Sequence, residues 1–146
     1  MRYRCSKVEV AGIAVLTDHR LIFAGWSARW NGAVATIERQ PGARVPGVLY
    51  QLDREAVEAL DRFEGHPQVY RRKRVRVFAA DKRWRYAQAY ELQAPVERAP
   101  GSEYLSVIRR AYRTWGFAGV PRFQAALERH GSEAKAANAR RVTSTV

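Results

Sequence analysis

The sequence predicts an α+β protein: a small, mostly antiparallel or mixed, β-barrel-like sheet with helices flanking it. Three observations support this fold class. Short apolar and β-branched runs separated by turn residues fill the first half of the chain, and one pair of longer runs flanks a polar turn. Segments with helical spacing of apolar residues lie between and after these runs.

Four short runs in the first half predict separate strands, because they are rich in apolar and β-branched residues. They are Val8–Val15, Leu21–Ala24, Ala33–Ile37 and Val45–Leu52. Turn residues between them are Thr17-Asp18-His19, Gly25–Gly32 and Gln40-Pro41-Gly42.

A first helix is predicted after Asp53, whose side chain can cap it. Gly65 suits the position just past its end, and Pro67 prevents continuation. Four apolar residues at helical spacing predict one buried stripe: Ala56, Val57, Leu60 and Phe63.

The longer runs, Val69–Ala79 and Trp84–Leu92, predict a strand pair around Asp81-Lys82-Arg83. A loop with two prolines, Ala94–Gly101, follows the pair. We expect a second helix capped by Ser102 and ended by Gly116. Its inner face is predicted to carry Leu105, Ile108, Tyr112 and Trp115.

The end of the chain predicts a third helix and then a tail. Pro121 suits a first helical turn, Phe123, Ala126 and Leu127 follow, and Gly131 closes the helix. Residues 132–146 are small and polar, which predicts a disordered tail. We therefore expect one domain over residues 1–131.

Length and composition suit one domain with its own core, since the chain has 146 residues of which 47% are hydrophobic. Its apolar runs are too short to span a membrane. Neither a signal peptide behind Met1 nor a disulfide framework from the single Cys5 is expected. We expect a cytoplasmic protein.

The charge is strongly basic, at +12. A basic excess attracts polyanions, so a nucleic-acid-binding module is one interpretation. The arginines are dispersed, and the densest cluster, Arg71–Arg76, falls in a predicted strand whose side chains alternate between two faces. No nucleic-acid-binding motif accompanies the cluster, so an arginine-rich solvated surface is the preferred interpretation.

Glu64 is the candidate for acid/base chemistry. It falls in the last turn of the first helix, where a carboxylate meets the negative end of the macrodipole at a cost of about 0.3–1 kcal/mol. Partial burial would raise its pKa and suit it to proton transfer. Taken alone, the position favours a solvated glutamate at a helix end over a catalytic one. His19, His66 and His130 lack metal-ligand spacing.

Several short segments follow one another in a telling order. The most telling is Leu60-Asp61-Arg62-Phe63-Glu64-Gly65 with Tyr70-Arg71-Arg72. The others are Arg4-Cys5, Asp18–Phe23, Ser27–Ile37, Pro41-Gly42 with Val45–Tyr50, Ala89-Tyr90, and the Pro-x-x-x-Tyr that ends at Tyr104. In their order and spacing these segments resemble the γ-glutamylcyclotransferase-like (AIG2-like) family.

The resemblance implies the family's fold and an enzyme of lyase or acyltransferase type that acts on a small γ-glutamyl peptide or amine, as in glutathione metabolism. The substrate's α-amino group would attack its own side-chain amide carbonyl, releasing 5-oxoproline and a free amine. Glu64 would be the catalytic acid/base, without metal or cofactor. Residues implied to bind substrate are Tyr70, Tyr90, Tyr104, Trp30 and Gly32.

One departure from the family concerns the start of the chain. Family members usually open with a strand ending in Tyr-Gly-Ser-Asn, a loop that supplies backbone donors to the substrate. The sequence begins near the point that follows this loop. Loss of an oxyanion donor costs about 10²–10³ in rate. We therefore expect either a start upstream of Met1 or an impaired member that binds a γ-glutamyl-like ligand or a partner.

Overall fold

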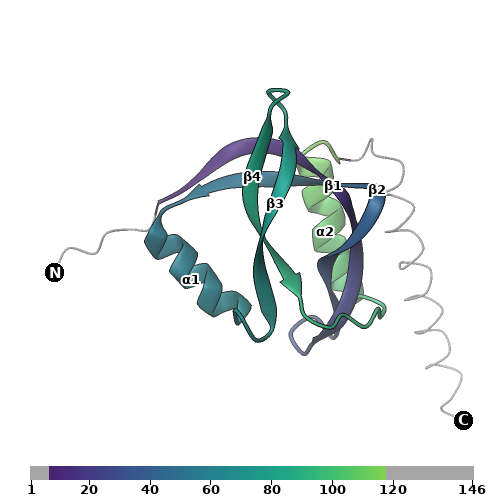
Figure 1. The fold of residues 1–146 in the computed structure, drawn as a ribbon. Helices are drawn as coiled ribbons and strands as arrows, with labels where there is room; N and C mark the ends of the chain where they lie inside the picture. The colour runs from purple at the N-terminus through teal and green to yellow at the C-terminus, as the bar shows by residue number, and fades with distance from the viewer. Residues whose placement is uncertain (1–6, 118–146) are drawn as a thin grey trace, which may run out of the picture. The chain divides into compact units, whose positions relative to one another are not determined.

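The computed structural model describes residues 7–117 and contains four strands and two helices (Figure 1). In chain order they are β1 (Val8–Ser27), β2 (Gly32–Leu52), α1 (Arg54–Glu64), β3 (Tyr70–Ala79), β4 (Trp84–Leu92) and α2 (Ser102–Thr114). The strands form a sheet in the order β2-β1-β3-β4, with β3 antiparallel to both β1 and β4. The α+β class is confirmed. The helix expected from Pro121 and the tail lie outside the described residues.

Within residues 7–117 the sheet is open, with β2 and β4 at its edges, so the barrel-like closure expected from the sequence is not seen there. The first two strands are also longer than expected. β1 runs through Thr17-Asp18-His19 and β2 runs through Gln40-Pro41-Gly42, so these two predicted turns are wrong.

The turn chemistry at these places bends the strands without ending them. Asp18 and Gly42 both have positive φ, 56° and 77°. The Gly42 N–H donates a hydrogen bond to the Asp18 carboxylate (2.9 Å), so a side chain of one strand satisfies the backbone of the other. The remaining predicted turn, Gly25–Gly32, is confirmed in a shorter form, over residues 28–31 between β1 and β2.

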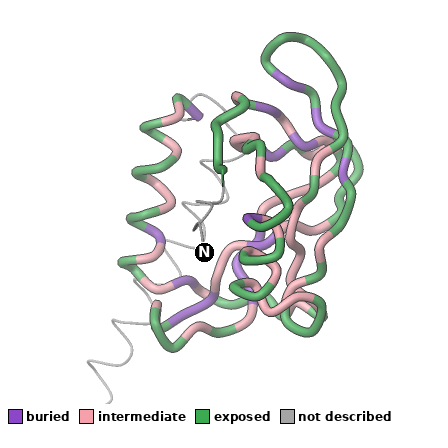
Figure 2. The backbone as a smooth tube through the Cα atoms, turned by 90° about the vertical axis from the view of Figure 1, so that its left-hand side faces the viewer, coloured by how far each residue is buried: buried purple, intermediate pink, exposed green. Residues whose placement is uncertain are grey.

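The contacts divide the chain into two compact units. The first comprises the chain up to Arg20 together with Glu38–Gln93, and the second comprises Leu21–Ile37 and the chain from Ala94 onward. The first unit buries Ala14, Leu16, Val45, Ala56, Val75, Val77 and Ala79. The second buries Ile22, Phe23, Ala24, Ala33, Thr36, Leu105 and Phe117. Figure 2 shows these buried residues in purple, and the turn between β3 and β4 as exposed.

The first unit contains α1, whose two ends are as the sequence predicts. The Asp53 carboxylate accepts a hydrogen bond from the Ala56 N–H at 2.8 Å. Gly65 follows the helix in the left-handed conformation (φ 65°), and its N–H donates to the Arg62 carbonyl. One prediction fails, because Phe63 is 79% exposed. It lies three residues beyond Leu60, on the edge of the apolar face instead of its centre.

The same unit contains the predicted β3–β4 hairpin. Its register pairs Arg72 with Tyr90 and Arg74 with Gln88. Because side chains alternate along a strand, Val75, Val77 and Ala79 point into the core while Arg72 and Arg74 lie on the opposite face.

The second unit contains α2, and here the predicted cap is wrong. Gly101 occupies the N-cap, without a side-chain hydrogen bond, and Ser102 is the first helical residue. The helix thus begins one residue earlier than predicted, and its N-cap must be a glycine, since a Cβ on Gly101 would lie 2.0 Å from the Trp30 carbonyl oxygen. The expected inner face is confirmed: Leu105 is buried and Ile108, Tyr112 and Trp115 are half-buried.

Candidate functional site

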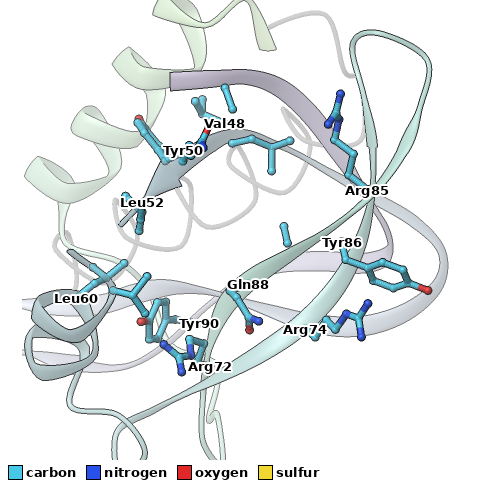
Figure 3. A pocket seen from close by; sticks show the side chains of 15 residues that line it. Val48, Tyr50, Leu52, Leu60, Arg72, Arg74, Arg85, Tyr86, Gln88 and Tyr90 are labelled. Atoms are coloured by element: carbon cyan, nitrogen blue, oxygen red, sulfur yellow. The ribbon is translucent and has the colours of Figure 1, made fainter. Parts of the chain in front are cut away.

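A cavity of about 520 Å³ lies within the first unit (Figure 3). The end of β2 contributes Val48–Leu52, and α1 contributes Val57 and Leu60. The β3–β4 hairpin contributes Arg72, Arg74, Arg85, Tyr86, Ala87, Gln88 and Tyr90. A concave site with apolar walls and a few polar groups is the usual form of a small-molecule site, and this volume falls in the usual range of about 300–1,000 Å³.

One end of the cavity carries a hydrogen-bonded group of three side chains. The Asp61 carboxylate accepts from the Tyr90 hydroxyl (2.5 Å) and from the Arg72 guanidinium (2.9 Å). α1 positions Asp61, while the hairpin register places Arg72 opposite Tyr90. This group therefore ties the helix to the hairpin beside the cavity.

The environment of Tyr90 keeps its hydroxyl protonated. Burial and the adjacent Asp61 carboxylate raise the pKa of Tyr90 to about 12. The His66 ring lies edge-on to the Tyr90 ring, with centroids 6.4 Å apart, and its Nδ1 accepts from the Arg72 N–H at 3.2 Å. Tyr90 is thus a neutral donor whose orientation is set by its partners.

Glu64 is the last residue of α1, directly before the Gly65 cap. Partial burial raises the pKa of its carboxyl above the ordinary value, as expected from the sequence. Within residues 7–117 this carboxyl has neither a hydrogen bond nor an ion pair. Glu64 is not among the residues that line the cavity, whereas Leu60 is. Residues four apart on a helix share a face, so Glu64 lies on the same face of α1 as Leu60. The two are separated by about 6 Å along the helix axis.

The basic cluster of β3 divides as strand alternation predicts. Arg72, Arg74 and Arg76 share one face, and Lys73, which pairs with Glu91 at 2.7 Å, lies on the other. Two of the three stack on rings of β4: Arg74 lies 3.9 Å from the centroid of Tyr86, and Arg76 lies 4.1 Å from that of Trp84.

Trp30, Gly32 and Tyr104 belong to the second unit, where the structure brings them together. The Trp30 and Tyr104 rings are 5.2 Å apart, and the Tyr104 hydroxyl accepts from the Ala35 N–H at 2.9 Å. A Cβ on Gly32 would lie 2.2 Å from the backbone nitrogen of Gly101. In this unit, then, Gly32 allows two backbones to cross closely, and Tyr104 holds β2 to α2.

In the first unit, Tyr90 lines the cavity, while Tyr70 begins β3 on the face that also carries Arg72. Sequence reasoning assigned no role to Asp61, Arg72, Arg74 or Gln88. For Arg72, Arg74 and Gln88 the alternation of β3 and β4 contained a signal, but it becomes readable only once the strand register is known. Asp61 lies on α1, and its contact with Tyr90 depends on where the hairpin meets that helix.

The fold is α+β, and its first unit holds a cavity of the size usual for small-molecule sites beside a helix that ends in a half-buried carboxyl. The chain belongs to the family described as "Gamma-glutamyl cyclotransferase, AIG2-like", whose model matches residues 1–109. Its fold is accordingly γ-glutamylcyclotransferase-like.

Similar proteins agree with this assignment. A "Gamma-glutamylcyclotransferase" of Mus musculus is 37% identical over 57 residues, which are 36% of this chain and 30% of the mouse protein. The chain thus matches less than a third of that relative's length, and what the whole protein does is a matter for proposal.

Solved structures share the fold. One described as "Gamma-glutamyl cyclotransferase" superposes with a TM-score of 0.73 at 24% identity, covering 83% of this chain and 73% of that one. An uncharacterized protein from Homo sapiens gives the same values. YkqA from Bacillus subtilis superposes with a TM-score of 0.68 at 26% identity, covering 84% of this chain and 44% of YkqA.

Neither helix within residues 7–117 is long and apolar enough to cross a membrane. Over the same residues, no group of three or more His, Cys, Asp or Glu side chains is placed to hold a metal ion.

Proposed function

We propose that this protein cleaves a γ-glutamyl peptide or amine, glutathione included, by internal cyclisation, releasing 5-oxoproline and a free amine. This is a lyase-type reaction, and we place it in the cytoplasm. Membership of the γ-glutamylcyclotransferase-like family supports the reaction class. The observation that carries the choice of residue is the half-buried Glu64 carboxyl with its raised pKa and its lack of an ion pair among residues 7–117.

The reaction needs one proton carrier. Glu64, as carboxylate, takes a proton from the substrate's α-ammonium group, and the freed amine attacks the side-chain amide carbonyl of the same γ-glutamyl unit. A five-membered lactam forms as the new C–N bond replaces the old one. The protonated Glu64 then returns its proton to the departing amine nitrogen. The attacking nitrogen also gives up its second surplus proton as the lactam forms, and the departing amine takes up that proton to leave as an ammonium ion. Both reacting groups belong to one molecule, so holding it in a folded conformation supplies much of the rate enhancement.

The properties of Glu64 suit this cycle. A carboxyl with a pKa raised toward neutrality is both a better base and, once protonated, an acid that still gives up its proton near pH 7. An ion pair with one of the many arginines would lower that pKa, and within residues 7–117 Glu64 has none. The neutral Tyr90 hydroxyl and the cavity lie farther along the same helix face and offer a place for the substrate.

The test is release of 5-oxoproline from glutathione and γ-glutamyl dipeptides, measured by chromatography. We expect Glu64→Gln to lower kcat by about 10²–10⁴, the usual contribution of a general acid–base group. The matched control is Glu55→Gln, an exposed carboxylate in the first turn of the same helix, which should leave kcat unchanged. We also expect kcat/KM to decrease on the acidic side of its pH profile with an apparent pKa above 4.5, the ordinary pKa of glutamate.

If Glu64→Gln and Glu55→Gln turn over substrate equally well, Glu64 is not the proton carrier. If the folded wild-type protein binds γ-glutamyl dipeptides but releases no 5-oxoproline, the protein is a binding relic and the proposed activity is wrong.

A further inference from the structure

One face of the β3–β4 hairpin carries a row of rings and guanidinium groups. Arg76 pairs with Tyr86 in the strand register. Phe78 pairs with Trp84, and their rings lie 5.2 Å apart. Because side chains alternate along a strand, these two pairs share one face with Arg74. We call these five residues the aromatic–arginine strip.

The contacts within the strip repeat along the hairpin. The Arg74 guanidinium lies 3.9 Å from the centroid of the Tyr86 ring. The Arg76 guanidinium lies 4.1 Å from that of Trp84. In both cases the ring is the diagonal neighbour on the partner strand, a position within reach of long side chains. A guanidinium held by its plane keeps the N–H groups at its edge available to a partner.

The strip is open to solvent. The Trp84 side chain is 47% exposed and that of Tyr86 is 66% exposed. Among residues 7–117 neither Arg74 nor Arg76 has an ion pair with a carboxylate. Contiguous exposed rings commonly mark an interaction surface, whereas single ones need no explanation. The strip therefore offers rings and cations that the described part of the chain does not use.

The hairpin also holds a local excess of positive charge. Residues 70–92 contain eight arginines and lysines against two acidic residues, so this segment supplies +6 of the net charge of +12. The two carboxylates are taken by cations outside the strip: Asp81 pairs with Arg85, and Glu91 pairs with Lys73. A partner that complements this surface is therefore anionic.

The spacing of the strip selects among anionic partners. Side chains on one face of a strand recur about every 6.8 Å, so rings and guanidinium groups repeat at this interval. Single-stranded nucleic acid also repeats a planar base and a phosphate, and its bases stack on aromatic rings and guanidinium planes. A duplex keeps its base faces stacked inside, and an acidic peptide has no planar group at each anion. A membrane surface fits less well, because the hairpin turn carries Asp81, Lys82 and Arg83.

We propose that the aromatic–arginine strip binds single-stranded nucleic acid. Bases stack against Trp84 and Tyr86, and phosphates bind the outer N–H groups of Arg74 and Arg76. Stacking does not read base edges, so this binding has little sequence preference. It is a second function, separate from the cleavage of a γ-glutamyl compound. The arginines are dispersed in the sequence, and the strand register is what gathers them beside the rings.

The strip and the cavity meet at one end only. Arg74 and Tyr86 lie side by side at the edge of the cavity, with the Tyr86 ring directed away from Leu52 and Leu60 (Figure 3). The other three residues of the strip are outside the cavity lining. Variants of Trp84 and Arg76 therefore test the strip without altering the cavity wall.

The test titrates the full-length protein into a short fluorescein-labelled single-stranded DNA of mixed sequence and follows fluorescence anisotropy. We expect Trp84→Leu to weaken binding about tenfold, as for the loss of one stacked base, with the salt dependence unchanged. Trp84→Phe keeps a ring and should retain most of the affinity. Arg76→Gln should make the slope of log K against log salt less steep by about 0.7, the contribution of one phosphate contact on a single strand.

Arg71→Gln is the matched control. Arg71 is an exposed residue of the same strand, but its side chain lies on the opposite face, so the variant removes the same charge away from the strip. It should leave both the affinity and the salt slope unchanged. Thermal unfolding of each variant shows whether it is folded, and Arg76→Gln decides the question if Trp84→Leu is not.

Three results would overturn the inference. They are no binding of the DNA at low salt, equal effects of Arg71→Gln and Arg76→Gln on the salt slope, and wild-type affinity of a folded Trp84→Leu variant. Competition gives a further check. Unlabelled single-stranded DNA or RNA should displace the probe at least about tenfold better than duplex DNA or polyglutamate. Equal displacement by all of them would mean attraction to net charge alone, and this also overturns the inference.

Sedimentation with phosphatidylserine vesicles distinguishes the membrane. Vesicle binding that depends on Trp84, in the absence of DNA binding, would make the strip a membrane surface and overturn the assignment to nucleic acid. The outcome does not depend on whether the protein releases 5-oxoproline, so this inference and the proposed function stand or fall separately.

Discussion

Gly65 ends α1 directly after Glu64, and replacing it with alanine tests how strictly the chain must turn there. Its φ of 65° is a conformation that costs a residue with a Cβ about 1–2 kcal/mol. Alanine also restricts the unfolded chain, which returns about 0.4–1 kcal/mol. The new Cβ would meet Val69 Cγ2 at 3.0 Å, but Val69 is 53% exposed and its side chain can shift. We therefore expect a net loss of about 1 kcal/mol.

Gly47→Ala is the control, because Gly47 has no positive φ and a Cβ there would meet nothing within 4 Å. It should gain about 0.4–1 kcal/mol from the unfolded chain. The two variants should then differ by about 5 °C in Tm for a chain of this size. Urea and thermal unfolding followed by circular dichroism measure both quantities. If Gly65→Ala is as stable as Gly47→Ala, the left-handed turn after Glu64 is not a constraint.

Three further substitutions test the groups around the site. Asp61→Asn should lower the pKa of Tyr90 from about 12 toward 10.0, because it removes a carboxylate beside the hydroxyl, and ultraviolet absorbance follows the titration. Glu64→Gln should stabilise the protein by about 0.3–1 kcal/mol at pH 7, because it removes a carboxylate from the negative helix end. Tyr104→Phe should cost about 1–2 kcal/mol, because the Ala35 N–H loses an acceptor.

The contribution of Glu64 to the stability of the protein depends on pH. The pKa of Glu64 is raised on folding, so its contribution to stability is present below pH 4.5 and is lost as pH rises through the folded value. Glu64→Gln should therefore match the wild type at pH 3 and exceed it at pH 7. Equal stability at both pH values would contradict this reasoning.

The other two substitutions have controls of their own. Tyr86→Phe removes a hydroxyl from a ring that is 66% exposed, and it should cost nothing, in contrast with Tyr104→Phe. For Asp61→Asn, an unchanged pKa of Tyr90 would mean that burial alone causes the shift.

Local signals explain what the sequence could predict. The first helix was predicted at both ends because Asp53 and Gly65 act on their immediate neighbours through short-range hydrogen bonds. The β3–β4 hairpin was equally predictable from two alternating runs around a short polar turn. The raised pKa of Glu64 was expected from partial burial, and burial is its cause in the structure.

Long-range pairing explains what the sequence could not predict. The continuity of β1 and β2 depends on partners distant in the chain, such as the Asp18 carboxylate that satisfies Gly42 across 24 positions. The hydrogen bond between Asp61 and Tyr90 spans 29 positions and depends on where the hairpin meets the helix. Likewise, the need for a glycine at the N-cap of α2 depends on the Trp30 backbone, which no local pattern indicates.

The division of the chain has a consequence for how the protein can be dissected. The first unit is interrupted by Leu21–Ile37, and β1 and β2 each pass from one unit into the other. No single cut of the polypeptide therefore yields two intact pieces. A fragment ending at Gln93 holds every residue of the first unit, but it also carries that 17-residue insert without the α2 residues that cover its apolar side chains.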